Sequence, residues 1–216
     1  MRIEQPSIKV LFHYPITDDG EILQPEVFLE MVGRTCYKSE GKITETSARD
    51  FIRMLNDRGH AAMLEHCVAS AHIVCNRGLT HELVRHRIAS YGQESTRFCN
   101  YSKDQFDHTI GVIMPPFATT DGRAEIEWRQ AMVDAEKHYF NLIGIGEPAQ
   151  IARGVLPIDL KTEIWITTNL REWQHIFSLR CSNKAHPQIR QTFRSALPIF
   201  AKNVPSMFSK LNSKFS

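Results

Sequence analysis

Residues 161–180, KTEIWITTNLREWQHIFSLR, change hydrophobic period within one continuous stretch. Apolar and polar side chains alternate over residues 161–168, which predicts a strand with one buried face. Asn169 is a residue type favoured at the N-cap, and the apolar side chains after it recur at helical spacing as far as Arg180. A chain built this way must pack a helix beside a half-buried sheet.

The rest of the sequence contributes strands and helices that mostly do not alternate as βαβ units. Strands are expected at residues 9–14, 66–75 and 110–114. Helices are expected at residues 25–36, 46–57, 80–87, 123–143, 147–153 and 186–202. Pro198 lies inside the last of these and should kink it or end it early. We therefore predict an α+β fold, a small and mostly antiparallel sheet with packed helices, in a single domain over residues 1–216.

Apolar side chains in helical phase mark the candidate core. In the order of the helices, they are Val27, Phe28, Met31 and Val32; Phe51, Ile52 and Leu55; Leu79, Leu83 and Val84; and Ile189, Phe193, Leu197 and Phe200. In the helix that ends at Arg180, the residues Trp173, Ile176 and Phe177 share one face with that arginine.

Composition restricts the class of protein. With 216 residues and 42% hydrophobic side chains the chain can bury a sizeable core, and a net charge of +2 gives no overall attraction to nucleic acid. Five cysteines without a C-x-x-C pair argue against a disulfide framework or a zinc knuckle and fit a reducing compartment. The sequence shows neither a signal peptide nor a long apolar run, so we expect a cytoplasmic protein without a membrane or nucleic-acid partner.

The sequence resembles three catalytic or ligand-binding motifs in part but fulfils none of them. HELVRH places His81 and His86 five positions apart instead of four, so they do not share the helix face that a zinc protease needs, and we predict no metal site. Gly144-x-Gly146-x-x-Ala149 follows a predicted helix, whereas a dinucleotide fingerprint follows a strand. Ser95 lacks the surroundings of a nucleophile elbow, so we interpret it as a ligand-binding hydroxyl.

The segment RHRIASYGQESTR, residues 85–97, concentrates donors that a simple basic turn would not require. The helix dipole favours cations at a helix C-terminus. This accounts for Arg85, His86 and Arg87 but not for the rest of the segment. In an extended segment Gln93, Ser95 and Arg97 would share a face, and Gly92 would let the backbone approach a ligand. These groups can hold phosphates.

Two further arginines, Arg180 and Arg153, also indicate an anion-binding site. Arg180 on an inward face requires an anion, which can be an internal carboxylate such as Glu147 or Asp159, or a ligand; the sequence leaves both open. Arg153 ends a short helix, where a capping role is the simpler explanation. Together with the RHR group, these residues predict a site for a phosphorylated, planar ligand.

Arg85-His86-Arg87, followed by seven residues and Ser95, resembles the RHR-x7-S signature of the flavin-dependent thymidylate synthases. The flanking segments agree over about residues 8–200. They are Gly59-His60, Glu65-His66, His81-Glu82-Leu83-Val84, Ser95-x-Arg97, Ala152-Arg153-x-Val155-Leu156-Pro157, Asn169-Leu170-Arg171, His175, Arg180 and Ala185-His186-Pro187-Gln188-Ile189-Arg190. Gly92 departs from the Asn or Ser of many members.

The resemblance implies an activity, a fold and a set of ligands. The fold would be the family's own α+β type. The enzyme would convert dUMP to dTMP with a methylene group from 5,10-methylenetetrahydrofolate, with FAD as hydride carrier and NADPH as reductant. It would be a homotetramer whose sites are shared between subunits. By position, the residues facing FAD would be His60, Arg85, His86, Arg87, Asn169, Arg171 and His175. Those facing dUMP would be Glu82, Arg85, Gln93, Glu94, Ser95, Thr96, Arg97, Arg153 and Arg180.

Arg180 would be the catalytic residue, since a guanidinium opposite N3 of the uracil favours the anionic ring and makes C5 more electron-rich. Two alternatives stay open. One is the same fold making a hydroxymethylated pyrimidine, which the mass of the product would distinguish. The other is a non-catalytic nucleotide-binding or RNA-binding protein, which would show a steep salt dependence of RNA affinity and no NADPH oxidation.

Overall fold

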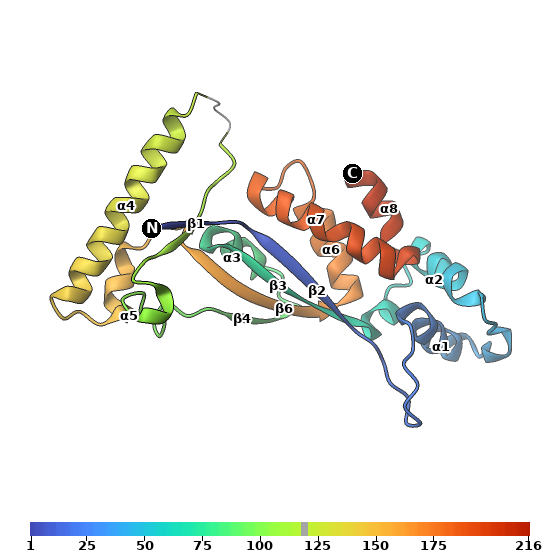
Figure 1. Cartoon of the computed structure of the whole chain (residues 1–216). Coiled ribbons are helices and arrows are strands. Elements are labelled where there is room, and N and C mark those ends of the chain that lie inside the picture. Colours follow the sequence, from blue (N-terminus) through green and yellow to red (C-terminus); the bar gives the residue numbers. More distant parts are fainter. Residues whose placement is uncertain (118–120) are drawn as a thin grey trace. The chain divides into compact units, whose positions relative to one another are not determined.

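A computed structural model describes residues 1–117 and 121–216 of the chain (Figure 1). The described chain forms two compact units. Unit 1 comprises Met1–Ser7, Ile73–Arg85 and Gly92–Ile164, and unit 2 comprises Ile8–His72, His86–Tyr91 and Trp165–Ser216. The chain enters and leaves each unit more than once, so neighbours in sequence can belong to different units.

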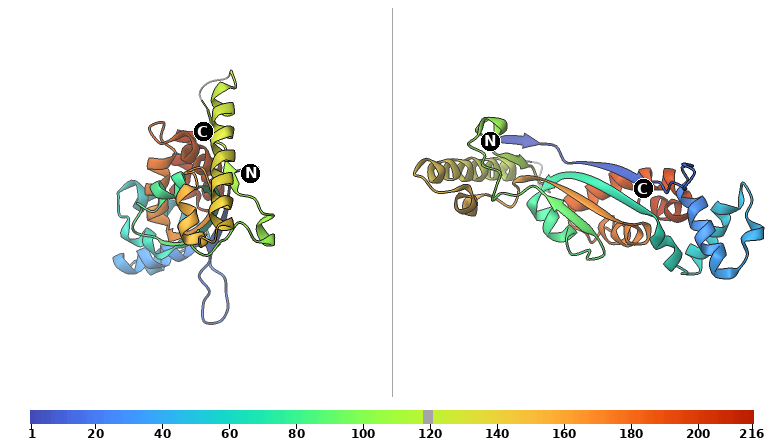
Figure 2. Two further views of the ribbon diagram at one scale, coloured as in Figure 1. Left: turned by 90° about the vertical axis from the view of Figure 1, so that its left-hand side faces the viewer. Right: turned by 90° about the horizontal axis from the view of Figure 1, so that it is seen from below.

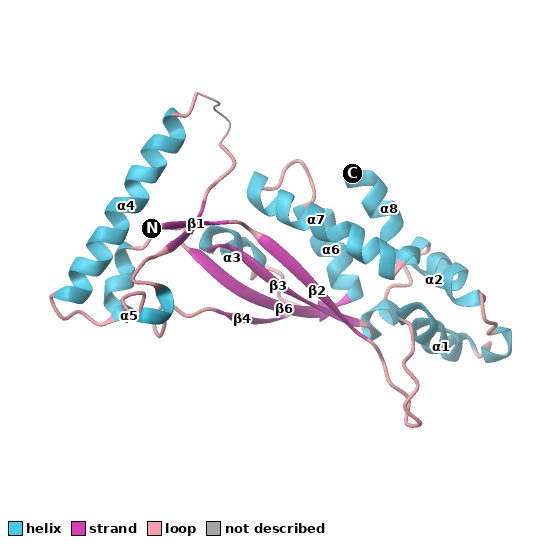
Figure 3. Cartoon of the chain, in the orientation of Figure 1, coloured by secondary structure: helices cyan, strands magenta, loops and turns pink. Residues whose placement is uncertain are grey.

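The fold is α+β with a small, mostly antiparallel sheet, as predicted (Figure 3). The strands are β1 (Arg2–Glu4), β2 (Ser7–His13), β3 (Val68–Asn76), β4 (Ser90–Gln93), β5 (Gly111–Ile113) and β6 (Lys161–Asn169). Four of them form a sheet in the order β2-β3-β6-β4, while β1 and β5 form a parallel pair in which Arg2 is opposite Gly111.

The predicted helices agree with the structure within two residues at each end, except that the helix predicted at residues 80–87 begins three residues earlier and ends four residues earlier. The helices are α1 (Pro25–Tyr37), α2 (Ser47–Asp57), α3 (Arg77–Leu83), α4 (Arg123–Gly144), α5 (Ala149–Ala152), α6 (Leu170–Arg180), α7 (Pro187–Asn203) and α8 (Pro205–Phe215). Strand β1 and helix α8 were not predicted from the sequence. Strand β1 has three residues, too few for a period to show. The apolar side chains Met207, Phe208, Leu211 and Phe215 of α8 do recur at helical spacing, and this is the signal that would have indicated the helix.

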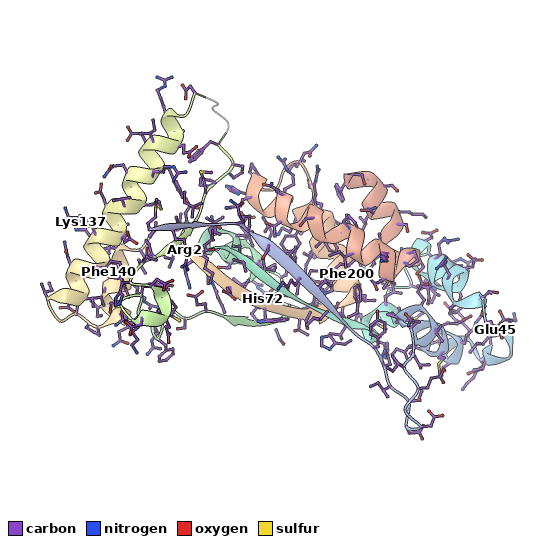
Figure 4. The ribbon with its side chains drawn as sticks, viewed as in Figure 1. Arg2, Glu45, His72, Lys137, Phe140 and Phe200 are labelled. Carbon is purple, nitrogen blue, oxygen red and sulfur yellow. The ribbon has the colours of Figure 1, made fainter. Side chains whose placement is uncertain are left out.

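Unit 2 is built around an aromatic core on α6, α7 and α8. The rings of Trp173 and Phe177 each lie 4.9 Å, between centroids, from that of Phe200, which in turn lies 5.1 Å from Phe208. All four side chains are fully buried, and Figure 4 labels Phe200 on α7. The indole of Trp173 donates a hydrogen bond of 3.0 Å to the carbonyl oxygen of Ala69, so its polar atom is satisfied in the core.

The strand-to-helix switch at residue 169 is confirmed. The Asn169 side chain accepts a hydrogen bond of 2.9 Å from the backbone nitrogen of Glu172 and so caps α6. The predicted face of α6 is confirmed as well, because Trp173, Ile176 and Phe177 are fully buried. This cap and this face hold α6 in a defined rotation.

Unit 1 has its own apolar core beneath α4, which Figure 2 shows as one long continuous helix. The buried members of this core are Tyr101, Ile110, Val112, Met132, Tyr139, Ala152 and Leu160. Asn76 caps α3 by accepting a hydrogen bond from Leu79, and its amide donates to Asp159 over 2.6 Å. Trp128 of α4 also donates to Asp159, over 2.9 Å, and this bond ties α4 to the chain that precedes β6.

One predicted face is wrong, and another is wrong at one residue, since Leu79 and Leu83 are buried as predicted and Val84 is not. Val27 and Met31 are 38% and 43% exposed, whereas α1 buries Leu29, Glu30 and Gly33. The carboxylate of Glu30 can be buried because Arg34 and Ser47 donate hydrogen bonds to it. Val84 is 40% exposed, because α3 ends at Leu83 and the helical phase that would turn this side chain inward stops there.

Pro198 does not end α7, which continues from Pro187 to Asn203. The side chains around the proline compensate for the backbone hydrogen bond that it cannot donate, since Ala196, Leu197 and Phe200 are all buried. No helix among the described residues is long and apolar enough to cross a membrane.

Candidate functional site

The RHRIASYGQESTR segment passes from one unit to the other and back. Arg85 belongs to unit 1, residues 86–91 to unit 2, and the chain from Gly92 onward to unit 1. The predicted site residues therefore form two groups. Those in unit 1 are Glu82, Arg85, Gln93, Glu94, Ser95, Thr96, Arg97 and Arg153. Those in unit 2 are His60, His86, Arg87, Asn169, Arg171, His175 and Arg180.

Two residues of the unit 1 group, Thr96 and Arg153, line a cavity of about 410 Å³. Its lining includes Arg77, His81, Thr96 and Arg153. Arg153 donates a hydrogen bond from Nη1 to the hydroxyl of Thr96, which is buried. Two arginines, a histidine and a hydroxyl around one cavity make a suitable set of groups for an anion such as a phosphate.

Arg77 and His81 also line this cavity and were not predicted as site residues. They lie four positions apart on α3, so they occupy one helix face, and this spacing is the signal that would have indicated them. Arg77 also donates long hydrogen bonds, from Nη1 to the Glu94 carbonyl over 3.4 Å and to the Thr162 hydroxyl over 3.5 Å. These bonds connect its side chain to the residue after β4 and to the start of β6.

Two predicted ligand-binding residues have internal partners. The Gln93 amide donates to the hydroxyls of Thr80 and Thr162 over 3.1 and 3.2 Å. Glu94 accepts hydrogen bonds from Tyr101 over 3.0 Å and from Lys161 over 3.4 Å. A nucleotide that contacts either side chain has to share it with these partners.

The expected common face of Gln93, Ser95 and Arg97 is wrong, because β4 ends at Gln93 and residues 96–98 form a turn. The Ser95 hydroxyl accepts a long bond of 3.4 Å from the Arg97 backbone nitrogen. The Arg97 guanidinium lies 5.5 Å above the ring of Phe98, which is 78% exposed. The turn exposes Arg97 instead of aligning it with the strand.

The unit 2 group is organised around His86, which is 4% exposed. Its Nδ1 lies 3.0 Å from Oε1 of Glu172, and its Nε2 accepts a hydrogen bond of 3.0 Å from Nε of Arg180. The His175 ring meets the His86 ring edge-on at 5.5 Å. The Tyr91 hydroxyl donates to the His86 carbonyl over 2.7 Å and holds the backbone in place.

The surroundings of His86 keep its ring neutral. Burial lowers the pKa of His86 below its ordinary value of 6.5; the hydrogen bond to Glu172 raises it, and the positive charge of Arg180 lowers it again. Burial also raises the pKa of Tyr91 to about 12, with a further contribution from Glu172. Both groups are therefore uncharged at neutral pH.

A second cavity, of about 330 Å³, lies in unit 2. It is lined by Glu65, Ile88, Asn169, Arg171, Glu172 and His175. Arg171 forms an ion pair with Glu65, and both side chains are exposed. His60, another predicted flavin residue, accepts or donates a hydrogen bond of 2.6 Å at Nδ1 with the Tyr37 hydroxyl. The lining offers a cation, an amide and an apolar side chain, which suits part of a nucleotide cofactor.

His86, Glu172 and His175 could also hold a metal ion, since they bring one ligand atom each within 4.8 Å of one another. Both ring nitrogens of His86 are already engaged, with Glu172 and with Arg180. A metal would have to displace one of these partners, and the guanidinium beside it would repel the cation. The present arrangement therefore favours a hydrogen-bonded cluster.

The chain matches the family model described as thymidylate synthase complementing protein over residues 21–206. The flavin-dependent thymidylate synthase of Geobacter sulfurreducens is 33% identical over 191 residues, which cover 85% of this chain and 81% of that protein. The enzyme of the same name from Pyrococcus furiosus is 33% identical, covering 79% and 69%. That from Corynebacterium efficiens is 31% identical, covering 85% and 78%.

Proposed function

The chain belongs to the thymidylate synthase complementing protein family, and on that premise we propose that it converts dUMP to dTMP. The methyl group would come from 5,10-methylenetetrahydrofolate, FAD would carry the hydride, and NADPH would reduce the flavin. The observation that carries the proposal is the RHR-x7-S segment, which contributes residues to both units, each of which contains a cavity with cationic side chains.

The unit 1 cavity supports binding of the nucleotide phosphate. Arg153 and Thr96 already lie within hydrogen-bond distance, and Arg77 and His81 add two donors from α3. A phosphate dianion can accept from all of these groups, and a bidentate contact to arginine would fix its orientation. We assign this cavity to dUMP.

The unit 2 cavity supports binding of part of the flavin cofactor. Asn169, Arg171 and His175 supply donors, and Ile88 supplies an apolar contact. A cofactor phosphate at Arg171 would have to compete with Glu65, which holds that guanidinium. When bound, FAD supplies hydride transfer, chemistry that protein side chains do not provide.

Arg180 is the residue that we assign to the uracil ring. Its guanidinium would favour the anionic ring at N3 and raise the electron density at C5. The side chain is held through Nε by His86, so its orientation does not depend on substrate. We further propose a homotetramer with shared sites, in the cytoplasm, in which Arg153 and Arg180 need not reach one nucleotide from the same subunit.

The purified protein should be yellow, with flavin absorbance near ~450 nm that NADPH bleaches. Incubation with dUMP, 5,10-methylenetetrahydrofolate and NADPH should give a product with the mass of dTMP, and a hydroxymethylated mass would indicate the altered chemistry. Arg180→Ala should lose turnover and keep FAD. Colourless protein that cannot be reconstituted with FAD would contradict the proposal.

A further inference from the structure

The hydrogen-bond partners of His86 define where its proton lies. Nε of an arginine can only donate, so Nε2 of His86 must be the unprotonated acceptor of the Arg180 bond. The single ring proton is then on Nδ1 and is donated to Glu172, 3.0 Å away. Carboxylate, imidazole and guanidinium thus form one continuous chain of hydrogen bonds with a defined direction.

These hydrogen bonds connect two residues of α6 that are too far apart along the helix to contact each other directly. Glu172 and Arg180 are eight positions apart on α6, which corresponds to about 12 Å of helix rise. His86 reaches both from outside the helix, and its backbone is held by the Tyr91 hydroxyl. The Asn169 side chain accepts a hydrogen bond from the backbone nitrogen of Glu172, so the backbone position of Glu172 is set independently of its carboxylate.

Because Glu172 and His86 are buried, the Glu172 carboxylate determines which nitrogen of His86 carries the proton. The side chains of His86 and Glu172 are 3% and 11% exposed, so water competes little for their bond. Without the carboxylate, the His86 proton is free to lie on Nε2. That tautomer presents a donor to the donor of Arg180, and the guanidinium must then move.

We propose that Glu172 is a positioning residue for Arg180, acting through His86. The carboxylate selects the Nδ1–H tautomer, the tautomer presents Nε2 as an acceptor, and that acceptor fixes the Nε end of the guanidinium. The two amino groups of Arg180 are then aimed in one direction. This inference rests on the proposed function, in which Arg180 meets the uracil ring of dUMP.

The first test reads the tautomer directly. In the flavin-loaded wild-type protein the ¹⁵N signals of His86, assigned by their loss in His86→Gln, should show a protonated Nδ1 and an unprotonated Nε2. Glu172→Ala should shift them toward the mixed values of a free imidazole. Glu172→Gln keeps an acceptor oxygen and should retain most of the wild-type pattern. Signals that are unchanged in Glu172→Ala would overturn the proposal.

The second test is a double-mutant cycle on turnover with dUMP. Glu172→Ala should lower kcat about tenfold or more, with a smaller change in KM for dUMP, and Glu172→Gln should recover part of the loss. In an Arg180→Lys background, which keeps the positive charge and a residual turnover but lacks the guanidinium that His86 holds, Glu172→Ala should have almost no further effect on that residual turnover. Losses that multiply instead would overturn the proposal.

Glu125→Gln is the matched control, since it makes the same chemical change in an ion pair on the exposed face of α4. It should leave kcat unchanged. If the wild-type protein neither binds flavin nor turns over dUMP, the proposed function fails, and the ¹⁵N measurement on the protein as purified still decides the tautomer. Equal losses in the Glu125 and Glu172 variants would reject a specific role for Glu172.

Discussion

Nη1 of Arg153 lies 3.2 Å from the Thr96 hydroxyl, although 57 residues separate the two in the chain. The bond joins the turn after β4 to the end of α5. The hydroxyl belongs to the RHRIASYGQESTR segment, and the same cavity is lined by both residues. The capping role that Arg153 has by position alone does not account for this contact.

Arg153→Ala should therefore weaken dUMP binding. The loss of a charge-assisted hydrogen bond costs about 1.5–3 kcal/mol, or roughly 10- to 150-fold in Kd. Calorimetric titration with dUMP would measure it, while the flavin spectrum should stay unchanged. Arg129→Ala, which removes an exposed arginine of α4, is the control and should bind dUMP as the wild type does. Equal affinity in the two variants would remove Arg153 from the nucleotide site.

The lowered pKa of His86 makes stability depend on pH on the acid side. The unfolded chain takes up a proton near pH 6.5 that the folded protein, with its buried neutral ring, does not. Acid therefore favours unfolding, and the stability present above about pH 6.5 is lost as the pH falls below it. Denaturant unfolding at several pH values between about 5 and 8 should show a shallower acid slope for His86→Gln. An identical slope would place the titrating group elsewhere.

Thiol reactivity should separate Cys36 from the three buried cysteines. Burial raises the pKa values of Cys67, Cys75 and Cys181 to about 12, whereas Cys36 is exposed. The thiolate is the reactive form, so an aromatic disulfide reagent at pH 7.5 should modify Cys36 first and these three only after unfolding. Mass spectrometry of the early product would identify the site. Rapid modification of Cys181 would show that α6 opens locally.

Gly33 should resist replacement although it lies within a helix. A Cβ at this position would lie 2.6 Å from Cε1 of Phe51, a ring that is itself packed under the Arg34 guanidinium. Gly33→Ala should therefore destabilise the protein by about 1–3 kcal/mol, against the gain that helix propensity alone predicts. Thermal unfolding would measure the change.

Gly144→Ala is the matched control, since a Cβ there meets nothing within 4 Å. It should leave the melting temperature unchanged or raise it. A stabilising Gly33→Ala would mean that Phe51 can move aside at little cost.

Much of the fold could be predicted from local pattern. The alternation in β6, the Asn169 cap and the buried face of α6 all follow from short-range spacing, and each is confirmed. The hydrophobic pattern predicted burial wrongly where a polar side chain is buried because other side chains form hydrogen bonds with it. Glu30 looks like a solvent-facing residue of α1, but Arg34 and Ser47 satisfy its carboxylate and allow it to be buried.

The candidate site, too, could be predicted from the sequence only in part. The order Arg85-His86-Arg87 and Ser95 was enough to indicate the family, because a signature with its flanking segments is a property of the sequence itself. The sequence did not show that His86 bonds both to Glu172 and to Arg180, from 86 and 94 positions away. Helical and strand periods report which face of a segment is buried. They carry no information about which distant polar group will satisfy a donor or acceptor on that face, and only the tertiary packing decides that.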